Sequence, residues 1–134
     1  MTARISGLLV VRTVDAPSGW SPRGIAFDGA YLWVANVRTT NTEINLIGKI
    51  DITKDNEKVV RTVDVGYFPM GVTFDGAYLW VANYYSKRIS KIDVTTNKVV
   101  AEISVGTRPF GVAFDGTHLW VTNIESKDIN KILI

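Results

Sequence analysis

One segment of about fifteen residues occurs three times in this chain of 134 residues. The copies are PRGIAFDGAYLWVAN at 22–36, PMGVTFDGAYLWVAN at 69–83 and PFGVAFDGTHLWVTN at 109–123. The corresponding glycines Gly24, Gly71 and Gly111 lie 47 and 40 residues apart, a period typical of propellers and solenoids. Because one such repeat cannot bury its own apolar faces, the three copies are expected to pack against one another.

The copy at 69–105 predicts four antiparallel strands. The run PMGVTFD is followed by Asp75–Gly76, which suits a two-residue hairpin turn. The next strand, AYLWVAN, is apolar on both faces and therefore belongs inside a stack of sheets. RISKIDV predicts a third strand and KVVAEISVG a fourth. In the fourth, strict alternation places one set of side chains on a common face: Val99, Ala101, Ile103 and Val105.

Four strands in about 40 residues, buried in the middle and polar at the outside, describe one blade of a β-propeller. We therefore predict an all-β propeller fold with three four-stranded blades per chain. The blades are expected at residues 17–65, 66–105 and 106–134 of a single domain. No window shows the apolar spacing of a helix.

The segment AYLWVANYYSKRISKIDVTTNKVVAEISVG resembles the YVTN-type β-propeller repeat, which is related to the NHL and streptogramin-lyase-like propellers. WVAN, WVAN and WVTN at 33–36, 80–83 and 120–123 stand where that family carries its tetrapeptide. The resemblance covers residues 8–134 and implies the fold. It implies little about function, since such propellers include enzymes, surface proteins and binding scaffolds. Family members usually contain a full ring in one chain, whereas this sequence has three blades.

The strand count predicts pairing between two copies. LLVVRTVD at 8–15 aligns with the outer strand KVVRTVD at 58–64, while DINKILI at 128–134 is a third strand with no outer strand after it. Closed rings need about four to eight blades. We therefore expect a six-bladed homodimer that buries on the order of 2,000 Å² or more. In it, Leu8–Asp15 of each copy pairs with Asp128–Ile134 of the other. The alternative is that the chain is part of a longer propeller.

The loops from strand four to strand one and from strand two to strand three share one face of a propeller. Exposed aromatic and arginine side chains on such loops are typical of recognition surfaces, although some can simply cover the blade ends. The candidate ligand-binding residues are Trp20, Arg23, Arg38, Tyr67, Phe68, Tyr84, Tyr85, Lys87, Arg88, Arg108 and Phe110.

Other recurring residues are interpreted as structural. Asn36, Asn83 and Asn123 end the second strands. Their amides could bind Ca²⁺ or a sugar, but they are interpreted as residues that complete the turns through local backbone hydrogen bonds. Asp28, Asp75 and Asp115 belong to the hairpin turns, and Trp33, Trp80 and Trp120 to the core. His118 replaces Tyr31 and Tyr78 of the other copies. We predict no catalytic residue, no metal site and no cofactor.

Composition limits the function classes. The formal net charge is +2 with dispersed basic residues, so nucleic acid is not an expected partner. The chain has no cysteine, which excludes disulfides and thiolate chemistry. No apolar stretch predicts a membrane span and no signal peptide is recognised, so the location is left open, with the cytoplasm favoured. The predicted function is a non-catalytic scaffold that binds a protein, a glycan or an acidic ligand. The alternative is a streptogramin-lyase-like or lactonase-like enzyme, which a single histidine per chain disfavours.

Overall fold

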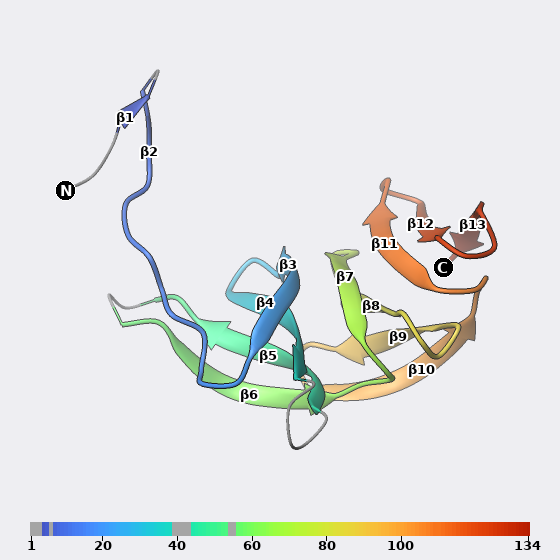
Figure 1. Ribbon diagram of the computed structural model, residues 1–134, viewed down its shortest axis with the longest axis horizontal. Helices are drawn as coiled ribbons and strands as arrows, with labels where there is room; N and C mark the ends of the chain where they lie inside the picture. Colours follow the sequence, from blue (N-terminus) through green and yellow to red (C-terminus); the bar gives the residue numbers. More distant parts are fainter. Residues whose placement is uncertain (1–3, 6, 39–43, 54–55) are drawn as a thin grey trace.

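The computed structural model describes residues 4–5, 7–38, 44–53 and 56–134, and every element within these ranges is a β-strand. Three antiparallel sheets are arranged like the blades of a fan (Figure 1). A separate short hairpin precedes them, formed by β1 (Arg4–Ile5) and β2 (Leu8–Leu9). Within the same ranges, no helix of sufficient length and apolarity to span a membrane is found.

Each sheet is one blade, and its strands follow in chain order from the inside of the fan to the outside. Blade 1 consists of β3 (Ser21–Phe27), β4 (Tyr31–Arg38), β5 (Ile44–Asp51) and β6 (Lys58–Asp64). Blade 2 consists of β7 (Pro69–Phe74), β8 (Tyr78–Asn83), β9 (Arg88–Asp93) and β10 (Lys98–Ser104). Blade 3 has only β11 (Pro109–Phe114), β12 (His118–Asn123) and β13 (Asp128–Leu133).

The inner strands are neighbours, with β3 beside β7 and β7 beside β11 (Figure 1). A Cβ atom built on Gly24 would lie 2.3 Å from the carbonyl oxygen of Met70, and one on Gly71 would lie 2.5 Å from that of Phe110. Only a residue without a side chain permits this approach, which explains the glycine of Pro-x-Gly in β3 and β7.

Two apolar clusters join the blades. The first lies between blades 1 and 2 and contains Trp33, Ala35, Ile47, Val63, Val72, Leu79, Val81 and Ile92. The second lies between blades 2 and 3 and contains Trp80, Ala82, Ile89, Leu119 and Val121. Strand β8 contributes to both clusters, and its side chains from Leu79 to Asn83 are all buried. The prediction that this strand is apolar on both faces is therefore confirmed.

The outer strands do not alternate as the sequence suggested. The pairing of β10 with β9 shifts between Val99 and Ala101, so Val100 is an extra residue. Val99 consequently packs against the first cluster and Ile103 against the second. The prediction that both share one face was wrong, because a β-bulge reverses the alternation within the strand. Strand β6 has the same irregularity, because its pairing with β5 shifts between Val59 and Arg61.

Each hairpin between the first two strands of a blade is held by its aspartate. The carboxylate of Asp75 accepts hydrogen bonds from the backbone nitrogens of Ala77 (2.8 Å) and Tyr78 (2.7 Å) and from the indole nitrogen of Trp80 (2.8 Å). The backbone nitrogen of Asp75 also donates to the carbonyl of Tyr78, so the two turn residues are Gly76 and Ala77 rather than Asp75 and Gly76. Gly76 has a φ of 100°, which favours glycine at this position.

Asp28 and Asp115 make the same contacts in the other two blades. Burial raises the pKa of Asp28 and Asp75, but the indole and backbone hydrogen bonds lower it more, so both values lie below the usual range. For Asp115 the hydrogen bond from Trp120 is the main reason that its pKa is lowered. The interpretation of these aspartates as turn residues agrees with this geometry.

The expected outer strand at 8–15 is not formed within the single chain. Only Leu8–Leu9 is extended in a sheet, paired with Arg4–Ile5, and residues 10–17 have no strand partner. Val10 and Val11 are 66% and 79% exposed. The reason is topological: β13, the edge that lacks an outer strand, lies at the opposite end of the fan (Figure 1).

Candidate functional site

Two kinds of loop meet on one face of blades 2 and 3. The backbone nitrogen of Tyr84 donates to the carbonyl of Phe68 (2.9 Å), and that of Tyr85 to Tyr67 (3.1 Å). In blade 3 the nitrogen of Ile124 donates in the same way to the carbonyl of Arg108 (2.9 Å). The loop that enters each blade is thus joined to the loop between its second and third strands, as the strand order predicts.

Four aromatic rings form a group on this face, which we call the aromatic cluster: Phe68, Tyr84, Tyr85 and Phe110. The ring centroids of Tyr84 and Tyr85 are 4.9 Å apart, and those of Phe68 and Tyr85 are 5.2 Å apart, both with edge-on geometry. The Phe110 centroid is 6.5 Å from that of Tyr84, so the group connects blades 2 and 3. Edge-on packing of this kind is a favourable arrangement for aromatic side chains.

Two guanidinium groups lie against these rings. Arg23, on the inner strand of blade 1, is 5.5 Å from the Phe68 centroid. Arg108 is 5.5 Å from the Tyr84 centroid and 5.6 Å from the Tyr85 centroid. Positively charged groups over aromatic faces are attracted by the ring electrons. All three blades therefore contribute to the site.

The two arginines differ in their charged partners. Arg108 forms a 2.8 Å ion pair with Glu125. Its hydrogen bond to the Tyr84 hydroxyl and the nearby Glu125 carboxylate raise the pKa of Arg108. Within the described ranges, Arg23 has no carboxylate at ion-pair distance. Arg23 is therefore the cation in this site that a carboxylate from outside the chain could pair with.

Backbone conformation holds two of these side chains on the face. Phe68 and Arg108 occupy equivalent positions before Pro69 and Pro109, with φ values of 62° and 58°. Residues other than glycine seldom adopt this left-handed conformation, and such positions are frequent in binding sites. A single sequence does not reveal this feature, because neither residue type favours it.

A shallow hollow lies beside the cluster at the inner edge of the blades. Arg23, Met70 and Phe110 hold the same position in the three inner strands and line this hollow, whose volume is about 400 Å³. The sequence equivalence of these residues therefore corresponds to proximity in space.

The structure brings six of the predicted site residues together: Arg23, Phe68, Tyr84, Tyr85, Arg108 and Phe110. Tyr67 is next to the cluster and 56% exposed. Lys87 is in the turn after Tyr85, with a φ of 53°. Arg88 begins β9, and its guanidinium group lies 3.4 Å from the carboxylate of Glu102 on β10. Arg38 ends β4, and its side chain lies outside the described residues.

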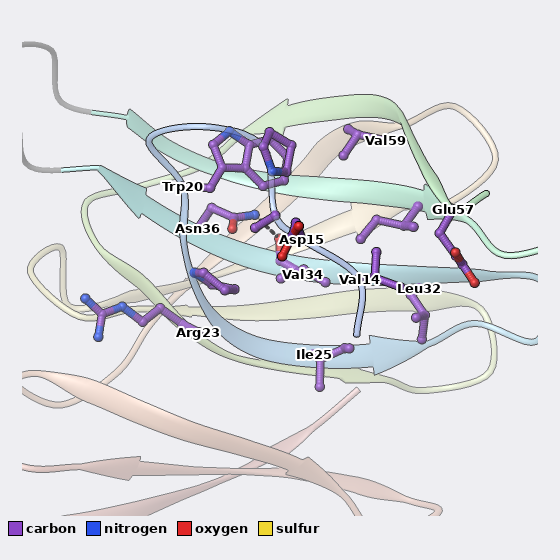
Figure 2. A pocket seen from close by; sticks show the side chains of 14 residues that line it. Val14, Asp15, Trp20, Arg23, Ile25, Leu32, Val34, Asn36, Glu57 and Val59 are labelled. Carbon is purple, nitrogen blue, oxygen red and sulfur yellow. Dashed lines mark hydrogen bonds between the residues drawn. The ribbon is translucent and has the colours of Figure 1, made fainter. Parts of the chain in front are cut away.

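Trp20 does not belong to the cluster. Its ring lies over Gly48, where an added Cβ would be 2.7 Å from the indole. It also lines a groove of about 350 Å³ between residues 14–17 and the outer face of blade 1 (Figure 2). The absence of a side chain at Gly48 makes room for the indole, whereas the equivalent positions are Ser90 and Asn130.

Sequence reasoning missed Glu125, which pairs with Arg108 across the two loops. The available signal was its position in the four-residue turn after β12, equivalent to Tyr85 in blade 2. The recurring asparagines lie inside: Asn36, Asn83 and Asn123 are 0%, 1% and 2% exposed, and their amides donate to groups of their own blades. They are not placed to meet a ligand at the surface.

His118 is half-buried and its Nδ1 is 2.9 Å from the Thr117 hydroxyl, at the hairpin end of β12. Among the residues that the structure describes, no group of three or more His, Cys, Asp or Glu side chains is arranged to hold a metal ion.

No protein-family model matches the sequence, and no curated protein matches it. Among solved structures, hydrazine synthase of Kuenenia stuttgartiensis is similar over 90% of this chain and 33% of that chain, with 28% sequence identity and a TM-score of 0.65. Glutaminyl cyclase of Myxococcus xanthus is similar over 95% of this chain and 53% of that chain, with 14% identity and a TM-score of 0.64. A gluconolactonase of Xanthomonas campestris is similar over 76% of this chain and 34% of that chain, with 18% identity and a TM-score of 0.59.

The chain thus spans between one third and about half of the length of these proteins. Hydrazine synthase and the gluconolactonase are β-propeller proteins, and the chain has the blade arrangement of this fold. The resemblance to the YVTN-type repeat stays a prediction from the sequence.

Proposed function

We propose that the protein is a non-catalytic binding module whose aromatic cluster, with Arg23 and Arg108, recognises acidic groups on a polypeptide or a glycan. The observation that carries this proposal is the meeting of two guanidinium groups and four aromatic rings from three blades on one face. Aromatic and arginine side chains supply most of the binding energy in many interfaces. The ligand's carboxylate is assigned to Arg23, because Arg108 already has Glu125.

The binding form is proposed to be a homodimeric six-bladed ring. Three blades form an arc, and residues 10–15 repeat VVRTVD, the sequence that forms most of β6. Exchange of this segment between two copies would give each blade 3 its fourth strand. Two equivalent ligand faces would then add avidity for a repetitive target.

Binding of acidic peptide is the direct test. A labelled penta-glutamate peptide is titrated against the protein by fluorescence anisotropy at low salt, with penta-glutamine as the neutral probe. We expect Arg23→Ala to weaken penta-glutamate binding about tenfold, as for loss of one charge-assisted hydrogen-bond pair. Lys98→Ala removes an exposed positive charge from outer strand β10 and serves as the matched control.

The same titration is repeated with Tyr84→Ala/Tyr85→Ala, together with a thermal melt. We expect lost binding and an unchanged melting temperature. Equal affinity for the two peptides, or equal weakening by Arg23→Ala and Lys98→Ala, would contradict recognition by this face. A glycan array is the parallel test for acidic sugars.

The second candidate function is a lactonase-like activity, which the fold similarity to a gluconolactonase favours. It is tested by following acid release from gluconolactone with the purified chain, before and after EDTA treatment. Saturable hydrolysis that EDTA abolishes would favour the enzyme over the binding module.

A further inference from the structure

The joints between the blades are built from one set of repeat positions. In each joint the preceding blade supplies a Trp from its second strand and an Ile from its third. Trp33 and Ile47 of blade 1 are both 0% exposed, and Trp80 and Ile89 of blade 2 are 2% and 0% exposed. The following blade covers them in both cases.

Blade 3 presents the same positions without a following blade. Trp120 is 38% exposed and Ile129 is 62% exposed. Sheet register makes them the equivalents of Trp33 and Ile47, since Thr122 pairs with Ile129 as Ala35 pairs with Ile47. The sequence-based assignment of Trp120 to the core is therefore wrong for the described chain, because no following blade in it covers the ring.

Blade 1 presents the opposite half of a joint. The blade 2 residues that pack against Trp33 in the first cluster include Val72, Leu79, Val81 and Ile92. Their equivalents in blade 1 are Ile25, Leu32, Val34 and Ile50, and all four line the groove of about 350 Å³ (Figure 2). Ile25 is 59% exposed, whereas its equivalent Val72 is 8% exposed.

The glycines of the inner strands also differ between blade 3 and the other two blades. An added Cβ on Gly24 or Gly71 would meet the backbone of the next inner strand at 2.3 or 2.5 Å. On Gly111 it would meet only the side-chain oxygen of Thr122, at 3.2 Å. Strand β7 approaches Gly111 on one side, but within the described residues no inner strand lies on the other side, where the Cβ of residue 111 would point.

A lysine makes a polar contact across the first joint. Nζ of Lys49, which is 8% exposed, donates to the carbonyl of Val94 (3.1 Å) and to Oδ1 of Asn97 (2.8 Å) in the outer turn of blade 2. Lys131 is its equivalent on blade 3 and is exposed. In blade 1 the residue equivalent to Asn97 is Glu57. Asn97 directly precedes Lys98, which pairs with Asp93 of β9, and Glu57 directly precedes Lys58, which pairs with Asp51 of β5.

We propose that two copies of this chain form a third joint of the same kind, with Trp120 of one copy seated in the groove on blade 1 of the other. Lys131 of the first copy then reaches Glu57 of the second, which in the single chain pairs with Arg12. Two such joints close the ring. This inference rests on the proposed two-copy ring and adds to strand exchange a contact between sheet faces.

The position of the N-terminal segment fits this joint. Residues 14–17 form one wall of the groove, opposite the sheet of blade 1, and the proposed joint places the other copy's blade 3 against this segment (Figure 2). The segment VVRTVD at 10–15 precedes β3 as β6 precedes β7. It can therefore become the fourth strand of that blade by the same connection that links blades 1 and 2.

The test measures assembly by sedimentation velocity across a concentration series. The variants are Trp120→Ala and Gly111→Ala on blade 3 and Ile25→Glu on blade 1. The matched control is Val100→Ala, an apolar residue that is 52% exposed on the outer strand of blade 2. We expect the unaltered chain and the control to sediment as two-chain particles. Trp120→Ala is expected to raise the dissociation constant at least about 30-fold, as for loss of a central interface tryptophan.

A mixing experiment separates the two halves of the joint. Trp120→Ala keeps its groove intact, and Ile25→Glu keeps its Trp120 intact, so a mixed dimer has one complete joint. We expect the mixture to dimerise at concentrations where each variant alone is monomeric. Circular dichroism melts of each variant, measured in parallel, establish that the monomers are folded; we expect Gly111→Ala to be folded and monomeric.

The outcomes are distinct. A two-chain particle that Trp120→Ala, Gly111→Ala and Ile25→Glu all leave unchanged would overturn the joint but not the ring. A monomeric unaltered chain would overturn both. Peptide binding by the aromatic cluster of one chain is measured separately by the anisotropy titration, so failure of the joint and failure of the binding function can be told apart.

Discussion

Replacing Gly71 with alanine tests whether the close contact between inner strands excludes a side chain at this glycine. The new Cβ would be 2.5 Å from the carbonyl oxygen of Phe110, 3.0 Å from the nitrogen of Val112 and 3.1 Å from the Cα of Gly111. A carbon normally approaches a carbonyl oxygen to about 3.3 Å at closest. Since all three contacts are backbone atoms, no side-chain rotation relieves them, and blade 3 must move away from blade 2.

The size of the effect follows from two opposing contributions. Overpacking of this kind costs about 1–3 kcal/mol. Alanine in a strand recovers about 0.5–1 kcal/mol relative to glycine, because the unfolded chain loses freedom. We therefore expect Gly71→Ala to lower the free energy of unfolding by about 1–2 kcal/mol and the melting temperature by about 4–8 °C.

Urea unfolding followed by tryptophan fluorescence and by circular dichroism measures this loss. The control is Gly111→Ala, with both substitutions made in a Trp120→Ala background so that any joint between copies is weakened equally. Gly111→Ala should be neutral or slightly stabilising there, because among the described residues the added Cβ would meet only the Thr122 hydroxyl, at 3.2 Å, and no backbone atom. Equal urea midpoints for the two glycine variants would show that the proximity of neighbouring inner strands does not determine how much stability the added Cβ removes.

Two further predictions concern the hairpin aspartates. Asp75→Asn should destabilise the chain by about 1–3 kcal/mol. The carboxylate of Asp75 accepts from the backbone with one oxygen and from the Trp80 indole with the other. An amide has a single oxygen, so its NH₂ group would face one of these N–H donors and that hydrogen bond would be lost. Urea melts check this against Asp93→Asn, whose carboxylate receives only backbone donors in its turn. The melting temperature should also fall as the pH falls from about 5 to below 3. The pKa values of Asp28 and Asp75 are lower in the folded chain than in the unfolded chain. Their ionised carboxylates therefore stabilise the fold above the unfolded-state pKa, and this stabilisation is lost when they are protonated. Asp75→Asn should show a shallower acid dependence, and an identical slope for both proteins would exclude Asp75 as a contributor.

The repeat in the sequence predicted most of the fold because three copies of one pattern reduce the ambiguity of short strands. Strands 69–74, 78–83, 88–93 and 98–104 match the predicted blade, and the loops that carry the cluster were placed on one face. The bulge at Val100 was not predictable, since a valine is compatible with both regular and bulged strands. The pairing of Arg108 with Glu125 depends on how two loops cross, which spacing along the chain does not specify.

Three positions of blade 3 have the same residue type as in the other blades but differ from them in burial. Trp120, Ile129 and Gly111 have the residue types of buried joint positions, yet they are exposed or open in the single chain. No following blade of the described chain covers these residues, and exposed apolar sheet faces favour association. The same positions therefore connect assembly with binding. In the proposed ring, Gly111 of one copy would face Arg23 and Gly24 of the other as Gly71 faces Phe110 and Gly111, so Phe110 of one copy would lie beside the other copy's Arg23. The ligand face would then continue across the joint, and acidic groups would meet arginines from both copies around one axis.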